Sequence, residues 1–299
     1  MDSELQKKIE RIESLCNVEK IIKKGGNSPK EIKRYYRING AAYRKFHSDK
    51  GFMHFRISQG DSIEENDVYY QPDLIAGFIK DGMTVLELGP GQGANGNYLA
   101  SSRPGASFIG VDLKPPKIKK STPKNLRYIT GDYKDLSAIE SGSVDVAFGI
   151  ETVVYSSEKD RVASEVFRTL KPGGVFICYD YSMTKELDEF LPYEQTALTL
   201  FAKCANSAPL ESNKTWRSHF ENAGFIVEGD RDYSKNILPD LRRLRNIARR
   251  IMDHDRRVKL LFGLFPAAFT NNVIIGYIGY DSYAEGLGLY DEWICRKPD

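Results

Sequence analysis

The sequence predicts an α/β protein built on a doubly wound, mostly parallel seven-stranded sheet with helical cap insertions. From residue 83 onward, short apolar runs rich in β-branched residues alternate with helical segments, which is typical of a parallel sheet covered on both faces. A glycine-rich turn follows the first of these strands. The length of 299 residues accommodates one such domain with additions.

Residues 1–62 precede the sheet and are predicted to form a helical lid. Their first helix carries apolar side chains on one face, at Leu5, Ile9, Ile12 and Cys16. A second helix is predicted to begin at Ser28, because Ser28, Pro29 and Glu31 make the pattern of a capped helix start. This helix carries three tyrosines, at positions 35, 36 and 43.

Residues 47–58 show no helical or strand period and are predicted to form a loop that contacts a ligand. The loop contains two histidines and two phenylalanines, namely His47, His54, Phe52 and Phe55. Either histidine is a candidate base, because imidazole titrates close to neutral pH.

The predicted core comprises residues 63–182, 212–231 and 284–299. Its strands are expected at 83–88, 107–112, 126–130, 144–150, 175–180, 225–228 and 289–296. Two insertions, 183–211 and 232–283, interrupt this plan and are predicted to extend the cap.

The charge balance favours a small-molecule partner over nucleic acid. Lys plus Arg is 43 against 41 for Asp plus Glu, and the net charge of +2 supplies no strong field. Four scattered cysteines without a CxxC pair and a charged amino terminus predict a cytoplasmic protein. Residues 260–280 are apolar but contain Pro266, Asn271 and Asn272, so no membrane span is predicted.

The glycine turn predicts a nucleotide-like cofactor. Glycine allows positive φ and close approach of the backbone to a ligand, and free amides at the following helix start favour electron-rich groups. Gly89, Gly91 and Ala94 also meet the fingerprint of nicotinamide dehydrogenases, which leaves a dehydrogenase as an alternative.

The residues around the glycine turn distinguish a dehydrogenase from another class of nucleotide-cofactor enzyme. Glu87 stands two residues before three alternate glycines, a pattern that resembles the first motif of class I S-adenosylmethionine methyltransferases, which have a Rossmann-like fold. The later landmarks of that family follow in order: Asp112 after the second strand, Gly131-Asp132 after the third, Val144 to Val146 in the fourth, and the turn 170–174 before the fifth.

The resemblance implies S-adenosyl-L-methionine as cofactor and S-adenosyl-L-homocysteine as product. It assigns the ribose hydroxyls to Asp112 and the adenine amine to Asp132. The expected cofactor contacts are Glu87, Gly89, Pro90, Gly91, Gly93, Asp112, Leu113, Gly131, Asp132, Tyr133 and Gly149.

The residues after strand four supply the first catalytic candidates. Glu151 is similar to the glutamate that follows this strand in sterol side-chain and tocopherol methyltransferases. Glu151, Tyr155 and His54 are the candidates for accepting a proton. Methyl transfer is an in-line displacement that requires no metal, and the sequence shows no cluster of His and Cys ligands, so a metal-independent enzyme is expected.

An apolar acceptor is expected from the aromatic content of the predicted caps. The chain has 17 Tyr and 15 Phe, and the Tyr35-Tyr36 pair and residues 51–55 resemble the lid of sterol methyltransferases. Aromatic faces can hold an isoprenoid and stabilise a carbocation. The expected substrate contacts are Tyr36, Tyr43, Phe52 and Phe55, and carbon methylation of a sterol-like or prenyl acceptor is the leading reading.

The second insertion contains a basic amphipathic helix. Ile237, Leu241, Leu244, Ala248 and Ile251 follow helical spacing, and five arginines lie between positions 242 and 250. Arg245 and Arg249 are predicted to bind a prenyl diphosphate, because arginine pairs bidentately with phosphate. A solvated face and peripheral contact with a membrane are the other readings of this helix.

Two other functions fit the same sequence features. An amine or phenol methyltransferase of the same fold needs only a base such as His54. A binding subunit without activity would also keep the cofactor loop. The sequence leaves the oligomeric state open.

Overall fold

A seven-stranded sheet forms the centre of the protein. The computed structural model describes residues 3–24, 28–46, 48 and 50–299 of the chain. The strand order is β3-β2-β1-β4-β5-β7-β6. The strands are β1 (Thr84–Leu88), β2 (Ser107–Asp112), β3 (Leu126–Thr130), β4 (Val144–Ile150), β5 (Leu170–Met183), β6 (Ile226–Asp232) and β7 (Gly288–Arg296).

The first five strands are parallel, whereas β7 runs antiparallel to both of its neighbours, β5 and β6. The predicted doubly wound, mostly parallel sheet is therefore confirmed. Its strand order reverses at β1, which lies between β2 and β4. In such sheets the crevice for a ligand opens at the carboxyl ends of the strands beside this point.

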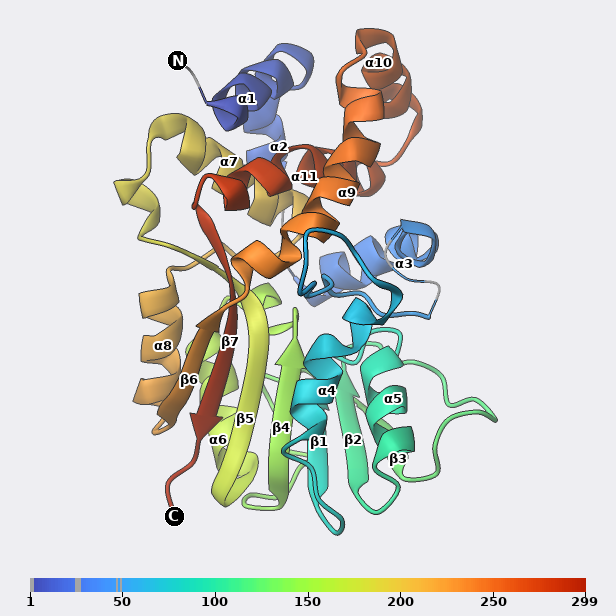
Figure 1. The fold of residues 1–299 in the computed structure, drawn as a ribbon, viewed down its shortest axis with the longest axis vertical. Coiled ribbons are helices and arrows are strands. Elements are labelled where there is room, and N and C mark those ends of the chain that lie inside the picture. The colour runs from blue at the N-terminus through green and yellow to red at the C-terminus, as the bar shows by residue number, and fades with distance from the viewer. Residues whose placement is uncertain (1–2, 25–27, 47, 49) are drawn as a thin grey trace.

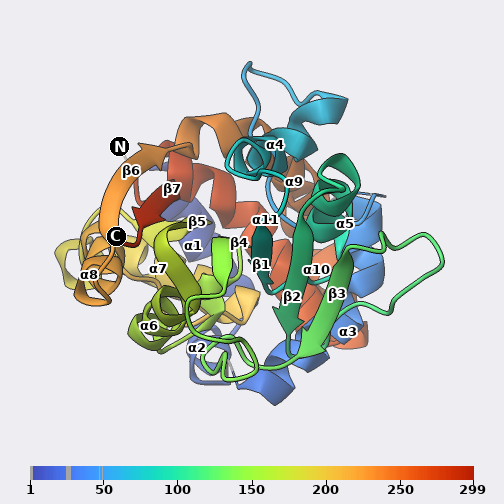
Figure 2. The same cartoon turned by 90° about the horizontal axis from the view of Figure 1, so that it is seen from below.

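Helices cover both faces of the sheet (Figure 2). One face packs against α4 (Tyr70–Ala76) and α5 (Ala94–Ser102) through Ile75 and Leu99, with the start of α9 (Ser234–Met252) beside them. The other face packs against α6 (Lys159–Thr169) and α8 (Asn213–Asn222) through Val166 and Trp216. Two short 3-10 helices precede helices of these layers: η1 (Glu65–Tyr69) comes directly before α4, and η2 (Val153–Tyr155) lies between β4 and α6.

A helical cap covers the carboxyl ends of the parallel strands, and the two chain termini lie at opposite ends of the molecule (Figure 1). Its apolar core joins distant segments, among them Leu5, Leu198, Met252 and Ile274. The cap helices are α1 (Glu4–Leu15), α2 (Val18–Lys24), α3 (Pro29–Phe46), η3 (Leu187–Glu189), α7 (Pro192–Ala205), α9, α10 (Asp255–Leu264) and α11 (Ala267–Ala284).

Local signals set the ends of the cap helices. The predicted capping box of α3 is present, since Ser28 N donates to Glu31 Oε2 at 3.1 Å and Glu31 N donates to Ser28 Oγ at 3.4 Å. The first predicted helix, α1, ends at Leu15, and the separate helix α2 begins at Val18, so Cys16 lies at a break and not within one continuous helix. Asn17 causes a new start there, because its Oδ1 accepts from Lys20 N at 2.8 Å.

Within the described residues, no helix combines the length and apolarity that crossing a bilayer requires. The apolar segment over 260–280 is divided between α10 and α11, with Pro266 before the first residue of α11.

The stacked pair Trp216 and Trp293 provides a test of the core. The two rings lie 4.8 Å apart at 12° and are fully buried between α8 and β7. We expect Trp293→Ala to lower the free energy of unfolding by about 3–5 kcal/mol, because a large buried ring leaves a cavity. Phe265→Ala, at a side chain that is 49% exposed, should cost less than about 1 kcal/mol. Denaturant unfolding measures both, and equal losses would contradict this view of the core.

Candidate functional site

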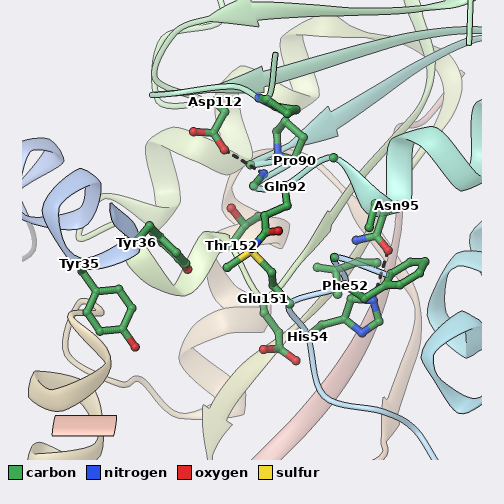
Figure 3. A pocket seen from close by; sticks show the side chains of 18 of the residues that line it. Tyr35, Tyr36, Phe52, His54, Pro90, Gln92, Asn95, Asp112, Glu151 and Thr152 are labelled. Atoms are coloured by element: carbon green, nitrogen blue, oxygen red, sulfur yellow. Dashed lines mark hydrogen bonds between the residues drawn. The ribbon is translucent and has the colours of Figure 1, made fainter. Parts of the chain in front are cut away.

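One large cavity lies between the sheet and the cap. It has a volume of about 1150 Å³ and opens at the carboxyl ends of β1, β2 and β4. Asp112 and Pro90 lie at one end of it and Glu151 and His54 at the other, with Thr152 between them (Figure 3). The glycine turn and the helices of the cap line the same continuous space.

The glycine turn has the backbone that only glycine adopts easily. Gly89, Gly91 and Gly93 have φ of 60°, 54° and 83°. A Cβ at Gly89 would overlap the hydroxyl of Thr152, and one at Gly93 would lie 2.7 Å from the Tyr128 hydroxyl. The turn therefore presents bare backbone to the cavity at the start of α5, where a ligand can approach closely.

Asp112 closes this end of the cavity. Its Oδ2 accepts from Gly91 N at 3.1 Å, and its Oδ1 accepts from Lys114 N at 2.7 Å. Burial raises the pKa of the Asp112 carboxyl, and the two backbone amides oppose that rise. A fixed carboxylate beside a glycine turn suits a ligand with vicinal hydroxyls, and Leu113 lines the cavity next to it.

The remaining predicted cofactor residues divide into two groups. Pro90 and Tyr133 line the cavity, and the Tyr133 hydroxyl donates to the Thr152 carbonyl at 2.8 Å. The others lie outside its lining: Glu87, Gly131, Asp132 and Gly149. Asp132 instead caps its own turn, accepting from Lys134 N at 3.0 Å.

Glu151 lies directly beyond β4 with its carboxyl group in the cavity. It is one of two non-glycine residues with positive φ in the described chain, at 49°. A left-handed glutamate costs backbone energy, and such residues gather at functional sites. Burial raises the pKa of Glu151 to about 8, although its hydrogen bonds favour the charged form.

Three donors from separate segments hold the Glu151 carboxyl. Oε1 accepts from Phe55 N at 2.6 Å and from the Tyr290 hydroxyl at 2.9 Å, while Oε2 accepts from the Tyr181 hydroxyl. Gln71 supports this arrangement, because its Nε2 donates to the Phe55 carbonyl at 2.7 Å and to the Tyr290 hydroxyl at 3.2 Å. The carboxyl group is therefore fixed in position and orientation.

A second buried carboxyl holds the turn that follows Glu151. Asp180 Oδ2 accepts from Thr152 N at 3.1 Å and from Val154 N at 2.9 Å. Burial raises the pKa of Asp180 to about 7. This residue lies beneath the cavity and sets the backbone on which Glu151 and Thr152 are carried.

The other two catalytic candidates also line the cavity. His54 is buried, with Nδ1 3.1 Å from the Phe55 carbonyl oxygen and Nε2 3.2 Å from Asn95 Oδ1. Burial lowers the pKa of His54, and a neutral imidazole has a single N–H, so the ring can donate to one of these two oxygens at a time. The ring of Tyr155 meets that of Tyr36 edge to face, with centroids 5.9 Å apart.

The far end of the cavity is apolar. Of the residues predicted to contact substrate, Tyr36, Phe52 and Phe55 line the cavity, whereas the side chain of Tyr43 lies outside the described residues, as does His47. Helices α7, α9 and α11 contribute the remaining wall, which includes Phe201, Leu244, Ile247, Ile251, Phe269 and Val273. A long apolar ligand suits this end.

The two arginines predicted to bind a diphosphate lie away from the cavity lining. Arg245 stacks on the ring of Tyr280 at 3.9 Å, and its Nη1 lies 3.5 Å from Asp281 Oδ1. Arg249 pairs with Asp253 at 3.0 Å. The apolar face of α9 is the one that lines the cavity, and these arginines are engaged by neighbouring carboxylates.

Sequence reasoning missed the partners of Glu151. Tyr181 and Tyr290 face each other across the antiparallel pair of β5 and β7, as do Tyr179 and Glu292. The alternation of Tyr179 and Tyr181 in one strand was the available signal, since residues two apart share a face. The strand predicted over 175–180 does not include Tyr181, whereas β5 extends to Met183.

No cluster of three or more His, Cys, Asp or Glu side chains suited to a metal occurs among the residues that the structure describes.

Comparison with known proteins shows similarity to methyltransferases, as the glycine turn predicts. Residues 79–224 match the family model of a methyltransferase domain. The chain is 26% identical over 213 residues to a sterol 24-C-methyltransferase of Yarrowia lipolytica, covering 67% of this chain and 54% of the relative. It is 29% identical over 172 residues to a botryococcene C-methyltransferase of Botryococcus braunii, covering 53% and 43%. The chain thus spans about half the length of these relatives.

Among solved structures, a cyclopropane synthase of Mycobacterium tuberculosis superposes with a TM-score of 0.71 at 14% identity, covering 90% of this chain and 98% of that one. Residues 79–224 are therefore a methyltransferase domain, and the sheet that contains them has the class I methyltransferase fold. The resemblance predicted from the glycine motif is confirmed.

Glu87 provides a test of electrostatics beneath the turn. It is 4% exposed, and burial together with the charge of Asp112 raises its pKa to about 8. The folded chain therefore holds a proton that the unfolded chain loses above its ordinary pKa of 4.5, so stability falls as pH rises toward 8. We expect Glu87→Gln to gain about 3 kcal/mol relative to wild type between pH 5 and pH 8.

Glu165→Gln is the control for this measurement. Arg168 lowers the pKa of Glu165, so that carboxyl stays charged in both the folded and the unfolded chain from pH 6 to pH 8. Its difference from wild type in free energy of unfolding should not change from pH 6 to pH 8. A flat profile for Glu87→Gln as well would show that Glu87 is not desolvated in solution.

Proposed function

We propose that the protein is an S-adenosylmethionine-dependent methyltransferase that methylates carbon in an isoprenoid alkene. The observation that carries the proposal is the buried Glu151 carboxyl, held by three donors in the cavity that the glycine turn also lines. This arrangement supplies one end for a nucleoside cofactor and one base beside an apolar space.

The residues around the glycine turn suit S-adenosylmethionine. The turn leaves no room for a Cβ at Gly89, and Asp112 offers a fixed carboxyl to ribose hydroxyls. Gly89, Pro90, Gly91, Gly93, Asp112, Leu113 and Tyr133 would hold the cofactor at this end of the cavity. When bound, it supplies an electrophilic methyl group, and its sulfur keeps the electron pair of the broken bond.

Methyl transfer to an alkene places a positive charge on the acceptor, which side chains of the cavity have to stabilise. The alkene gives its π electrons to the new carbon–carbon bond, which leaves a positive charge on the neighbouring carbon. The rings of Phe55 and Tyr181 lie in the same cavity, and aromatic faces stabilise such a cation. Transfer of an adjacent proton to Glu151 Oε2, which also accepts from the Tyr181 hydroxyl, restores a neutral alkene.

The nature of the cavity and the names of the relatives support a carbon acceptor. The apolar walls from α7, α9 and α11 favour an isoprenoid, and the two relatives are named as a sterol and a botryococcene C-methyltransferase. Methylation of an amine or phenol with His54 as the base requires a ring nitrogen that faces the acceptor, whereas the two ring nitrogens lie against the Phe55 carbonyl and the Asn95 amide. The geometry therefore supports a carbon acceptor better than the alternative.

Binding of the cofactor can be tested at Gly89. We expect Gly89→Ala to weaken binding of S-adenosylhomocysteine at least about 100-fold, because the added methyl overlaps Thr152 and the backbone has φ of 60°. Gly142→Ala, also at positive φ but with open space around it, is the control and should leave binding unchanged. Calorimetry measures both. Tight binding of a nicotinamide dinucleotide instead would overturn the cofactor assignment.

The base can be tested with labelled cofactor and a panel of isoprenoid alkenes. We expect Glu151→Gln to lower kcat about 100-fold or more with little change in KM, because the acceptor loses its proton sink. Tyr155→Phe should lower kcat less than about threefold. The opposite ranking would assign the proton to Tyr155. No label in any alkene, with transfer to amines or phenols, would exclude carbon methylation.

The pH profile gives an independent measure of the same group. Because Glu151 acts as a carboxylate, wild-type kcat/KM should rise with pH and level off above about 8. Tyr181→Phe removes a hydrogen bond that lowers the pKa of Glu151, so its rising limb should move to higher pH.

A further inference from the structure

Cationic side chains gather at one side of the cavity opening, on two segments far apart in sequence. Helix α3 carries four exposed cations, Lys30, Lys33, Arg34 and Arg37. The loop between β2 and β3 carries five more, Lys114, Lys117, Lys119, Lys120 and Lys124. We call residues 30–37 and 114–124 together the basic rim.

The two segments of the basic rim face one opening. Lys33 and Arg37 line the cavity from α3, and Lys117 and Lys119 line it from the loop. In both Figure 1 and Figure 2, α3 and the loop lie on the same side of the molecule, and the loop projects outward beyond β3. The cations therefore lie along one side of the cavity opening.

Few carboxylates lie near the cations of the basic rim, although Lys33 acts electrostatically on Asp112. Among the ion pairs of the described residues, none includes a side chain of the basic rim. Glu31, an acid on the same helix, is hydrogen-bonded to Ser28. The whole chain has a net charge of only +2, so this concentration of cations makes the molecule strongly asymmetric.

An apolar side chain stands in the middle of the loop. Ile118 is 62% exposed and lies directly between lysines in the stretch Lys117 to Lys120, after two prolines. Lysines that reach phosphate headgroups around an apolar side chain that enters the interface are the pattern of peripheral membrane contact. A small anion would need converging, partly buried donors, whereas these side chains are spread over two exposed segments.

We propose that the basic rim docks the protein on an anionic lipid bilayer, with Ile118 in the interface and the cavity entrance facing the membrane. The docking proposal rests on the proposed function, because an apolar isoprenoid acceptor would reside in a bilayer. It assigns membrane contact to α3 and the β2–β3 loop, whereas α9 has Arg243, Arg245 and Arg249 engaged by carboxylates.

Vesicle sedimentation of the full chain tests the docking surface. We expect wild type to bind vesicles of phosphatidylcholine with phosphatidylserine, to bind phosphatidylcholine alone far more weakly, and to dissociate at high salt. The triple variant Lys30→Gln, Lys120→Gln, Lys124→Gln removes rim charges that do not line the cavity. Its affinity for anionic vesicles should fall at least about tenfold.

A charge-matched control separates location from net charge. Lys80→Gln, Lys214→Gln, Lys235→Gln removes three exposed lysines outside the basic rim and should bind vesicles like wild type. Ile118→Ser should weaken binding without changing its salt dependence. Equal binding of wild type to both kinds of vesicle, or equal losses in the two triple variants, would overturn the proposal.

Turnover of an acceptor dispersed in detergent tests the proposed function separately from membrane docking. The rim variant should retain wild-type turnover there and lose turnover only when the acceptor is supplied in anionic vesicles. Methylation in detergent without any vesicle binding by wild type would refute docking alone. Selective binding to anionic vesicles without methylation of any acceptor would refute the function and leave the docking surface in place.

Discussion

The carboxyl group of Glu151 is the point on which the site depends, because it joins four segments that are distant in sequence. It lies at the end of β4, accepts from the Phe55 amide in the amino-terminal lid, and accepts from phenols on β5 and β7. An isolated buried carboxyl costs several kcal/mol, and this cost is offset only when every donor is in place. The position of the lid, the pairing of the two strands and the state of the carboxyl are therefore coupled.

Buried acids beneath the cavity extend this coupling into the sheet. Asp180 holds the turn after Glu151, and burial raises the pKa of Asp291 to about 7 on the neighbouring strand. The charge of each group depends on the exclusion of water by the layer above it, since desolvation is the largest cause of each raised pKa. A cap that covers these carboxyls thus determines their chemistry as well as the access of ligands.

What the sequence could predict follows from how local each signal is. The glycine turn, the position of Asp112 after β2 and the succession of strands along the chain were predictable because each depends on a few adjacent residues with a fixed backbone requirement. The roles of Tyr181 and Tyr290 depend on the register between β5 and β7, which no short stretch reveals. The amphipathic pattern of α9 identified a face, but not that its apolar side would line the cavity while Arg245 and Arg249 met Asp281 and Asp253. Tertiary neighbours decide such cases, and periodicity contains no information about them.

The length of β5 has a consequence for how the molecule folds. Strand β5 comprises Leu170–Met183. Its Ile177 packs on one face of the sheet and its Cys178 on the other, whereas Met183 packs in the core of the cap. A single rigid element thus belongs to all three apolar clusters. Loss of order in the cap would withdraw support from the centre of the sheet, so sheet and cap are expected to unfold in one cooperative transition, although the cap is assembled from separate insertions.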